Sequence, residues 1–180
     1  MPDDEGFFGE RAASRYDERH DHMFDPVVVG PTVDLLAELA EDGYLVFNTI
    51  FNLVTQDAQV ACFENAAAHL RSGGRFVIET GVPNIQRLPP GQTVIPGRAE
   101  PGGLSFDVFD VVTQRFSSQH FHFVDGQVQA FPVEFRYAWP AELDLMARIA
   151  GLRLRDRWSG WRSEPFTSLS RSHVSVYAKP

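Results

Sequence analysis

The chain has 180 residues, 43% of them hydrophobic, which is enough for one folded domain with a buried core. Its net charge of -8 at pH 7 argues against a nucleic-acid or anionic-membrane partner, because both need clustered Lys and Arg. Its one cysteine, Cys62, cannot form an internal disulfide, and its longest apolar run, Tyr44 to Val54, is too short to span a bilayer. These features predict a soluble cytoplasmic protein.

The first elements expected along the chain are a short helix and a longer one. Residues 16–25 are dense in titratable groups and are consistent with a short helix. Pro31 is suited to the first turn of a second helix, and Gly43 is a good left-handed stop. Its apolar stripe has helical spacing and consists of Val33, Leu36, Ala37 and Ala40.

A strand–helix–strand unit follows. Tyr44 to Ile50 reads as a buried parallel strand, Thr55 as the cap of the next helix, and Arg75 to Thr80 as the second strand. The helix ends at Ser72-Gly73-Gly74, and its expected buried residues are Val60, Phe63, Ala67 and Leu70. A unit of this length should be a right-handed crossover with the two strands parallel.

An antiparallel segment is expected next. Residues 82–103 are rich in proline and glycine and read as a loop. Two aromatic stretches, Leu104 to Val112 and Phe116 to Val124, precede a hairpin turn at Asp125-Gly126 and a returning strand over Gln127 to Tyr137.

The last elements are a helix and two strands. Pro140 opens the helix and Gly151 ends it, with inward residues Leu143, Met146, Ala147 and Ala150. Leu152 to Trp158 reads as a half-exposed strand whose solvated face carries Arg153, Arg155 and Arg157. His173 to Ala178 is the final strand.

Four stretches of the chain resemble class I S-adenosylmethionine (SAM) dependent methyltransferases, and they occur in the same order as in that family. AAAHLRSGGRFVIETG, residues 66–81, is similar to the helix end and fifth strand of that family. YDERHDHMFD resembles the lid segment, and YLVFNTIFNL resembles the fourth strand with the loop after it. AELDLMARIAGLRLRDRW, followed by SHVSVYAKP, resembles the last helix and the terminal antiparallel strand pair.

The chain departs from the family at its cofactor loop. Gly-x-Gly does not occur anywhere, and Glu41-Asp42-Gly43 runs directly into the match to the fourth strand. The missing block would amount to on the order of 80 residues. The resemblance therefore implies an α/β, truncated Rossmann-like methyltransferase fold: a half-sheet of order 4-5-7-6 with an antiparallel insertion. Its parts within one domain are 1–43 (lid and helix), 44–81 (remaining Rossmann unit), 82–139 (insert) and 140–180 (terminal helix and strand pair).

Removal of three strands would leave an apolar strand, Leu45 to Ile50, at the edge of the sheet. Exposed apolar edges favour pairing with another chain. We therefore expect a homodimer or a higher homo-oligomer through this edge.

Candidate site residues follow from the resemblance and from strand geometry. The resemblance implies that Tyr16, Phe47, Asn48 and Thr49 face SAM or the methyl acceptor; alternatively, Phe47 is core and Asn48 ends a strand. Glu79 ends the fifth strand, at the sheet edge where ligands bind. His20 in the lid-like segment, with His22 beside it, is a candidate base.

His120 and His122 form a second group of candidates. They alternate along one strand, so both rings should point to the same face, about 7 Å apart. They would line the acceptor pocket. A metal site is not predicted, because no third ligand is identifiable.

Three functions remain open from the sequence. The first is a SAM-dependent methyltransferase for a small organic molecule, with its cofactor site completed by a partner or a second copy. The second is a SAM-independent enzyme that reuses the acceptor pocket. The third is a non-catalytic remnant or binding module.

Overall fold

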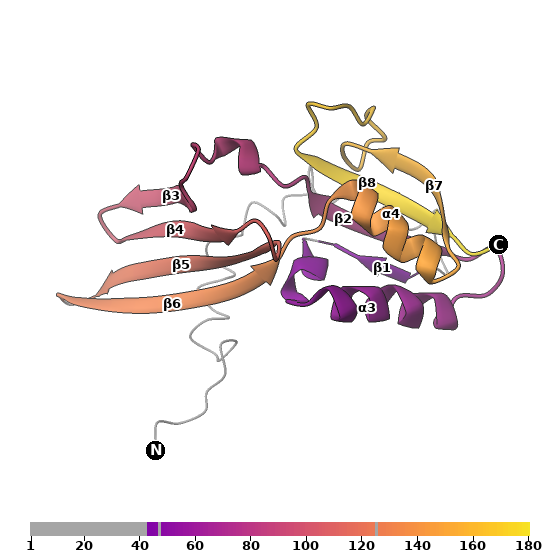
Figure 1. Ribbon diagram of the computed structural model, residues 1–180, viewed down its shortest axis with the longest axis horizontal. Coiled ribbons are helices and arrows are strands. Elements are labelled where there is room, and N and C mark those ends of the chain that lie inside the picture. The colour runs from indigo at the N-terminus through magenta and orange to yellow at the C-terminus, as the bar shows by residue number, and fades with distance from the viewer. Residues whose placement is uncertain (1–42, 47, 125) are drawn as a thin grey trace, which may run out of the picture. The chain divides into compact units, whose positions relative to one another are not determined.

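The computed structural model describes residues 43–46, 48–124 and 126–180 (Figure 1). The chain divides into two units, Met1–Ala40 and Glu41–Pro180, and every described residue belongs to the second. The predictions made for Tyr16, His20 and Phe47, and for the helix that starts at Pro31, fall outside the described residues.

A mixed four-stranded sheet forms one half of the described fold. It consists of β1 (Gly43–Leu45), β2 (Arg75–Gly81), β8 (Ser172–Ala178) and β7 (Arg153–Trp158), in the order β1-β2-β8-β7. β1 runs parallel to β2, and β8 runs antiparallel to both of its neighbours. The predicted order and directions of these four strands are confirmed, and β1 is an edge of the sheet within the part of the chain that the structure describes.

The first strand is shorter than predicted. β1 ends at Leu45, and Thr49–Asn52 form a 3-10 helix, η2, so the prediction of a strand up to Ile50 is wrong. Asn48 adopts a left-handed backbone conformation with φ 58°, which asparagine tolerates better than most residues. Ile50 is 1% exposed and packs into the core from η2. The apolar side chain is therefore buried by a helical turn, where the sequence pattern had suggested a strand.

Two helices, α3 (Gln56–His69) and α4 (Pro140–Ile149), pack against the mixed sheet. The Thr55 hydroxyl caps α3 by accepting a hydrogen bond from Ala58 N at 3.1 Å, as predicted. The Phe63 ring of α3 contacts a ring from each of two strands, with centroid distances of 5.3 Å to Phe76 and 5.6 Å to Tyr177. The α4 side chains in this core are Leu143, Met146 and Ala147, so its predicted inward face is confirmed.

A second sheet contains four antiparallel strands in the order β3-β4-β5-β6. Their bounds are Val94–Glu100, Gly103–Asp110, Arg115–Val124 and Gln127–Arg136. The β5–β6 hairpin confirms the predicted antiparallel segment. The prediction of a loop over 82–103 is wrong in part, because β3 and a 3-10 helix, η3 (Ile85–Arg87), lie within it. β3 is an edge strand with a register shift after Pro96, and both features make proline acceptable there.

β7 departs from the predicted alternation. Its pairing with β8 shifts register between Leu154 and Asp156, and Arg157 then lies opposite Ser175. The guanidinium of Arg157 is consequently part-buried and hydrogen-bonded, so its assignment to a solvated face is wrong. A bulge of this kind inverts the inside–outside pattern for every residue that follows it.

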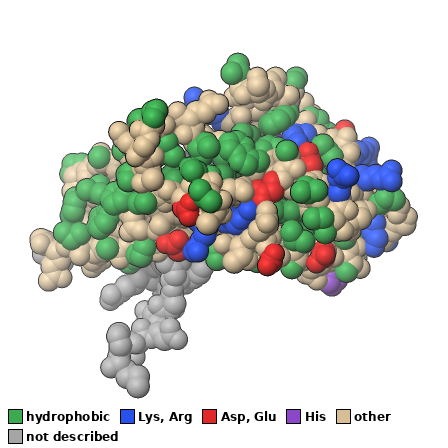
Figure 2. Space-filling model, in the orientation of Figure 1, with side chains coloured by type: hydrophobic (Ala, Val, Ile, Leu, Met, Phe, Trp, Pro, Cys, Tyr) green, Lys and Arg blue, Asp and Glu red, His purple; other side chains and the backbone are tan. Residues whose placement is uncertain are grey.

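Large hydrophobic side chains remain exposed on the antiparallel sheet. Figure 2 shows hydrophobic side chains gathered over the region that β3 to β6 occupy in Figure 1. The exposed residues on these strands include Val94, Leu104, Phe123, Val128 and Phe131.

Candidate functional site

The carboxyl ends of β1 and β2 meet at Asn48. The side-chain oxygen of Asn48 accepts hydrogen bonds from the Gly81 N–H at 2.6 Å and from the Thr80 hydroxyl at 3.0 Å. The Asn48 N–H donates to the Glu79 carbonyl at 3.3 Å. Asn48 thus fastens the chain that follows β1 to the end of β2. Open α/β sheets bind ligands beyond this edge.

The other candidates at this edge are Thr49 and Glu79. Thr49 is exposed, and its hydroxyl donates to the Val46 carbonyl, so this group closes the turn before η2. Glu79 is half-buried, and strand alternation places its side chain on the sheet face opposite that of Thr80. The structure therefore gathers Asn48, Thr49 and Glu79 at one sheet edge, and their roles toward a ligand remain predictions.

His120 and His122 lie in the other sheet, on the same face of β5. The His120 Nε2 atom is 3.0 Å from the Ser118 hydroxyl oxygen, and the His122 ring centroid is 5.4 Å from that of Phe131. The predicted candidates are consequently divided between two sheets. Their catalytic roles stay predictions. Within the described ranges, no group of three His, Cys, Asp or Glu side chains is placed to hold a metal ion.

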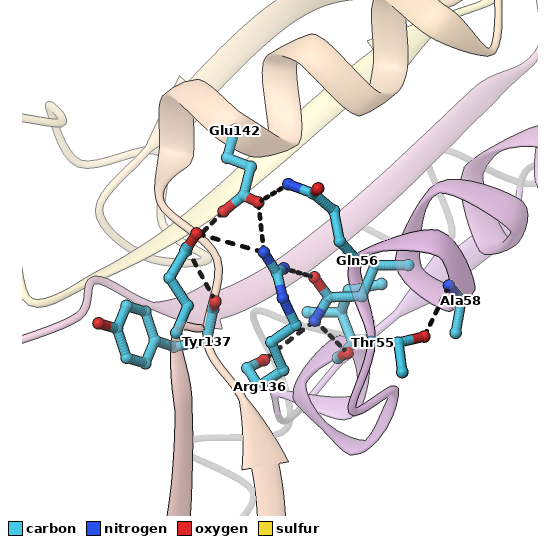
Figure 3. Close-up of polar contacts among 9 residues, drawn as sticks. Thr55, Gln56, Ala58, Arg136, Tyr137 and Glu142 are labelled. Carbon is cyan, nitrogen blue, oxygen red and sulfur yellow. Dashed lines mark hydrogen bonds and ion pairs between the residues drawn. The ribbon is translucent and has the colours of Figure 1, made fainter. Parts of the chain in front are cut away.

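A buried polar network joins the two sheets through α3 and α4 (Figure 3). Arg136, at the end of β6, forms an ion pair with Glu142 of α4 at 2.7 Å, and their side chains are 5% and 13% exposed. Glu142 also accepts hydrogen bonds from Gln114 at 2.6 Å and from Gln56 of α3 at 2.8 Å. Burial raises the pKa of the Glu142 carboxyl, but these hydrogen bonds, led by that from Arg136, outweigh it and hold the pKa below its usual value.

Gln59 extends this network to the loop after β1. It is fully buried in α3, and its side-chain nitrogen donates to the Ile50 carbonyl at 3.1 Å and to the Arg136 carbonyl at 2.9 Å. Its side-chain oxygen accepts from the Arg136 guanidinium. The antiparallel sheet is thereby tied to η2, next to Asn48 and Thr49. This network was not predictable from the sequence, because glutamine at a buried helix position has no periodic signal.

A second buried polar cluster lies on the face of β8 that meets α4. The Arg157 guanidinium pairs with Asp144 of α4 at 2.5 Å and donates to the hydroxyls of Ser175 at 2.7 Å and Tyr177 at 3.1 Å. His173 continues the row, with Nδ1 at 2.8 Å from the Ser175 hydroxyl. Burial, and after it the nearby Arg157 charge, lowers the pKa of His173 to about 4, so the imidazole is neutral at pH 7. The alternation His173, Ser175, Tyr177 was the available sequence signal.

The mixed sheet and the antiparallel sheet that precedes the last helix together match solved structures of one class of protein. This arrangement is that of class I SAM-dependent small-molecule methyltransferases, and these are the structural neighbours of the chain. The resemblance predicted from the sequence is confirmed. No protein-family model and no curated protein matches the chain.

Among solved structures, the chain is similar to the CcbJ methyltransferase from Streptomyces caelestis. The identity is 38%, the TM-score is 0.66, and the match covers 76% of this chain and 59% of that one. A SAM-dependent methyltransferase from Clostridium acetobutylicum shares the fold at 11% identity, with a TM-score of 0.58 and coverage of 77% and 59%. The chain thus spans less than two thirds of the length of either relative.

The described residues at this sheet edge do not by themselves make a complete SAM site. The sequence has no Gly-x-Gly turn to approach the cofactor closely. At the described sheet edge, the side-chain oxygen of Asn48 is already engaged by Thr80 and Gly81. We therefore assign no step of methyl transfer to these side chains.

The described helices contain none that is long and apolar enough to cross a membrane.

Proposed function

We propose that this chain is the acceptor-binding part of a SAM-dependent methyltransferase that acts on a small organic molecule. The observation that carries the proposal is the sheet order β1-β2-β8-β7, with β1 parallel to β2, together with 38% identity to a methyltransferase. The acidic net charge and the aromatic-rich antiparallel insert suit a small organic acceptor better than a nucleic acid.

A second chain is needed for cofactor binding in this proposal. The resemblance implies that family members carry the cofactor-binding strands after the segment that ends at Ala40, and the boundary between the two units also falls after Ala40. β1 presents an edge there, and Tyr44 in its centre is 56% exposed. A homo-oligomer or another polypeptide joined to this edge would complete the sheet and the SAM site.

Calorimetric titration with SAM is the decisive experiment. The purified chain, with its intact mass verified, is titrated at concentrations that span its association, and sedimentation is measured in parallel. The proposal expects saturable SAM binding that appears with the oligomer. Binding should weaken in Tyr44→Lys, whose charge opposes edge pairing, and should be unchanged in Leu169→Lys, which alters a side chain that is 88% exposed in the β7–β8 connection.

One sequence feature favours a second candidate, a SAM-independent enzyme that reuses the acceptor pocket. This feature is the lack of a Gly-x-Gly turn. An absence of SAM binding at every concentration would exclude completion of the SAM site by a second copy of this chain. Small-molecule binding that is sensitive to substitution of His120, His122 or Glu79 would then support the second, and the lack of both activities would leave a binding module.

A further inference from the structure

His173 occupies a distinctive place on the mixed sheet. It lies opposite Thr80, one register position from the end of the β2–β8 ladder, where Gly81 faces Ser172. Thr80 in turn donates to Asn48. His173 therefore sits at the same carboxyl edge of β2 as the candidate residues.

The hydrogen bonds around Ser175 indicate which imidazole nitrogen carries the proton. The Ser175 hydroxyl oxygen accepts from the Arg157 Nε–H at 2.7 Å. The hydroxyl has one hydrogen to donate, and His173 Nδ1, at 2.8 Å, is the acceptor that the described contacts provide. We therefore assign the proton of the neutral ring to Nε2, with Nδ1 as the acceptor.

The Nε2 atom of His173 is buried and has no hydrogen-bond partner among the residues that the structure describes. The residue as a whole is 0% exposed. An unmet buried donor costs about 1–3 kcal/mol, whereas an apolar side chain of similar size would avoid that cost. Such a donor in a fully packed region calls for a partner that binds there.

Phe166 covers this imidazole. Its ring centroid lies 5.8 Å from that of His173 and 5.6 Å from the Arg157 guanidinium carbon. Phe166 belongs to the irregular connection between β7 and β8, most of whose residues are exposed. A connection of this kind can move with little loss of buried contacts, so displacement of the Phe166 ring gives a path to His173.

We propose that His173 is a ligand-binding residue whose Nε2–H donates a hydrogen bond to an oxygen of the methyl acceptor. The ligand class is a small molecule that carries hydroxyl or carbonyl oxygens, because the imidazole N–H requires an oxygen acceptor. This assignment rests on the proposed function and names a contact within its acceptor site.

The first test needs no ligand. His173→Leu removes the unmet donor, and Gln59→Leu is the matched control, because Gln59 is equally buried but fully hydrogen-bonded. By scanning calorimetry at pH 7, the melting temperature of His173→Leu should fall less than that of Gln59→Leu, because removal of the unmet Nε2 donor offsets the loss of the Ser175 hydrogen bond. A fall in His173→Leu as large as that in Gln59→Leu would overturn the proposal, since it would show that water or protein already satisfies Nε2.

The second test uses two probes on the chain labelled with 15N-histidine. D-glucosamine carries an amine and several oxygens, and cyclohexylamine has the amine and a six-membered ring without oxygens. The Nε2 resonance, assigned by its loss in His173→Gln, should shift with D-glucosamine and stay fixed with cyclohexylamine. No shift with either probe, or the same shift with both, would overturn the assignment.

The outcome of the SAM titration and the outcome of this probe titration are independent of each other. SAM binding without a histidine shift would leave the proposed function standing and remove His173 from the site. A shift of the Nε2 resonance without SAM binding would support His173 as a ligand-binding residue and contradict completion of the proposed SAM site by a second copy of this chain.

Discussion

The side-chain oxygen of Asn48 lies 2.6 Å from the main-chain nitrogen of Gly81, and this contact closes the carboxyl edge between β1 and β2. The same oxygen accepts from Thr80, so one short polar side chain serves two donors of the neighbouring strand. The left-handed backbone of Asn48 directs the chain from there into η2. The backbone arrangement of the candidate site without a ligand therefore depends on Asn48.

Asn48→Gly should lower the free energy of unfolding by about 1–2 kcal/mol, because two hydrogen bonds are lost while the φ of 58° remains easy to adopt. Asn48→Ala should cost about 1 kcal/mol more, because alanine is strained at positive φ. Urea unfolding of the two variants measures both values. Equal stabilities for the glycine and alanine variants would contradict the role assigned to the backbone.

Replacement of Arg136 should be far more costly than replacement of an exposed arginine in the same sheet. Arg136→Met leaves the buried Glu142 carboxylate without its cation and should cost about 3–5 kcal/mol. Arg115→Met removes an ion pair to Glu134 whose side chains are 47% and 52% exposed, and should cost less than about 1 kcal/mol. Denaturant titrations compare the two, and similar losses would refute the structural role of the network.

Stability should depend on pH through His173. Its pKa is about 4 in the folded chain against 6.5 when unfolded, so the unfolded state binds more protons between these values. The free energy of unfolding should therefore fall as the pH drops from about 6.5 to about 4, by on the order of 3 kcal/mol from this residue. His173→Leu should flatten this part of the profile. Glu142, whose folded pKa is depressed, loses its contribution only at lower pH, so a slope that persists in His173→Leu above pH 5 would contradict the prediction.

Substitution of two adjacent glycines, Gly102 and Gly103, tests the packing of the antiparallel sheet. A Cβ atom on Gly103 would lie 2.3 Å from the Phe121 carbonyl oxygen, whereas one on Gly102 would meet nothing within 4 Å. Gly103→Ala should therefore force β4 away from β5 and cost about 2 kcal/mol or more. Gly102→Ala should change stability by less than about 1 kcal/mol. Thermal unfolding of both variants gives the comparison, and a neutral Gly103→Ala would show that the strands pair differently.

The strand order was predictable because it depends on segments whose hydrophobic pattern is strong. Phe76 to Ile78 and Val174 to Tyr177 are fully or nearly fully buried, and a continuous apolar run such as Phe76 to Ile78 identifies a central strand. The same reasoning failed at Ile50, since an apolar residue is equally well buried from a 3-10 turn. A hydrophobic sequence pattern predicts that a side chain is buried, but it predicts the backbone conformation less well.

The polar contacts of the site were harder to predict because they join residues that are distant in sequence. Gln59 and Arg136 are 77 positions apart, and nothing local marks either as a partner of the other. Arg157 was misassigned because one register shift in β7 reversed the alternation on which the prediction relied. Glu79 lies near the carboxyl end of β2, as its predicted place at the end of that strand implies.

The anchoring of the antiparallel sheet by Gln59 and Glu142 limits how this fold can be recombined. A chimera that exchanges only residues 82–139 with a relative would bring in Gln114 and Arg136 equivalents without the α3 and α4 side chains that receive them. The foreign sheet would then leave a charge buried against a mismatched surface. The antiparallel sheet is therefore transferable only when both helices are exchanged together with the strands, and mutations in Gln59 and Arg136 should arise together in evolved variants.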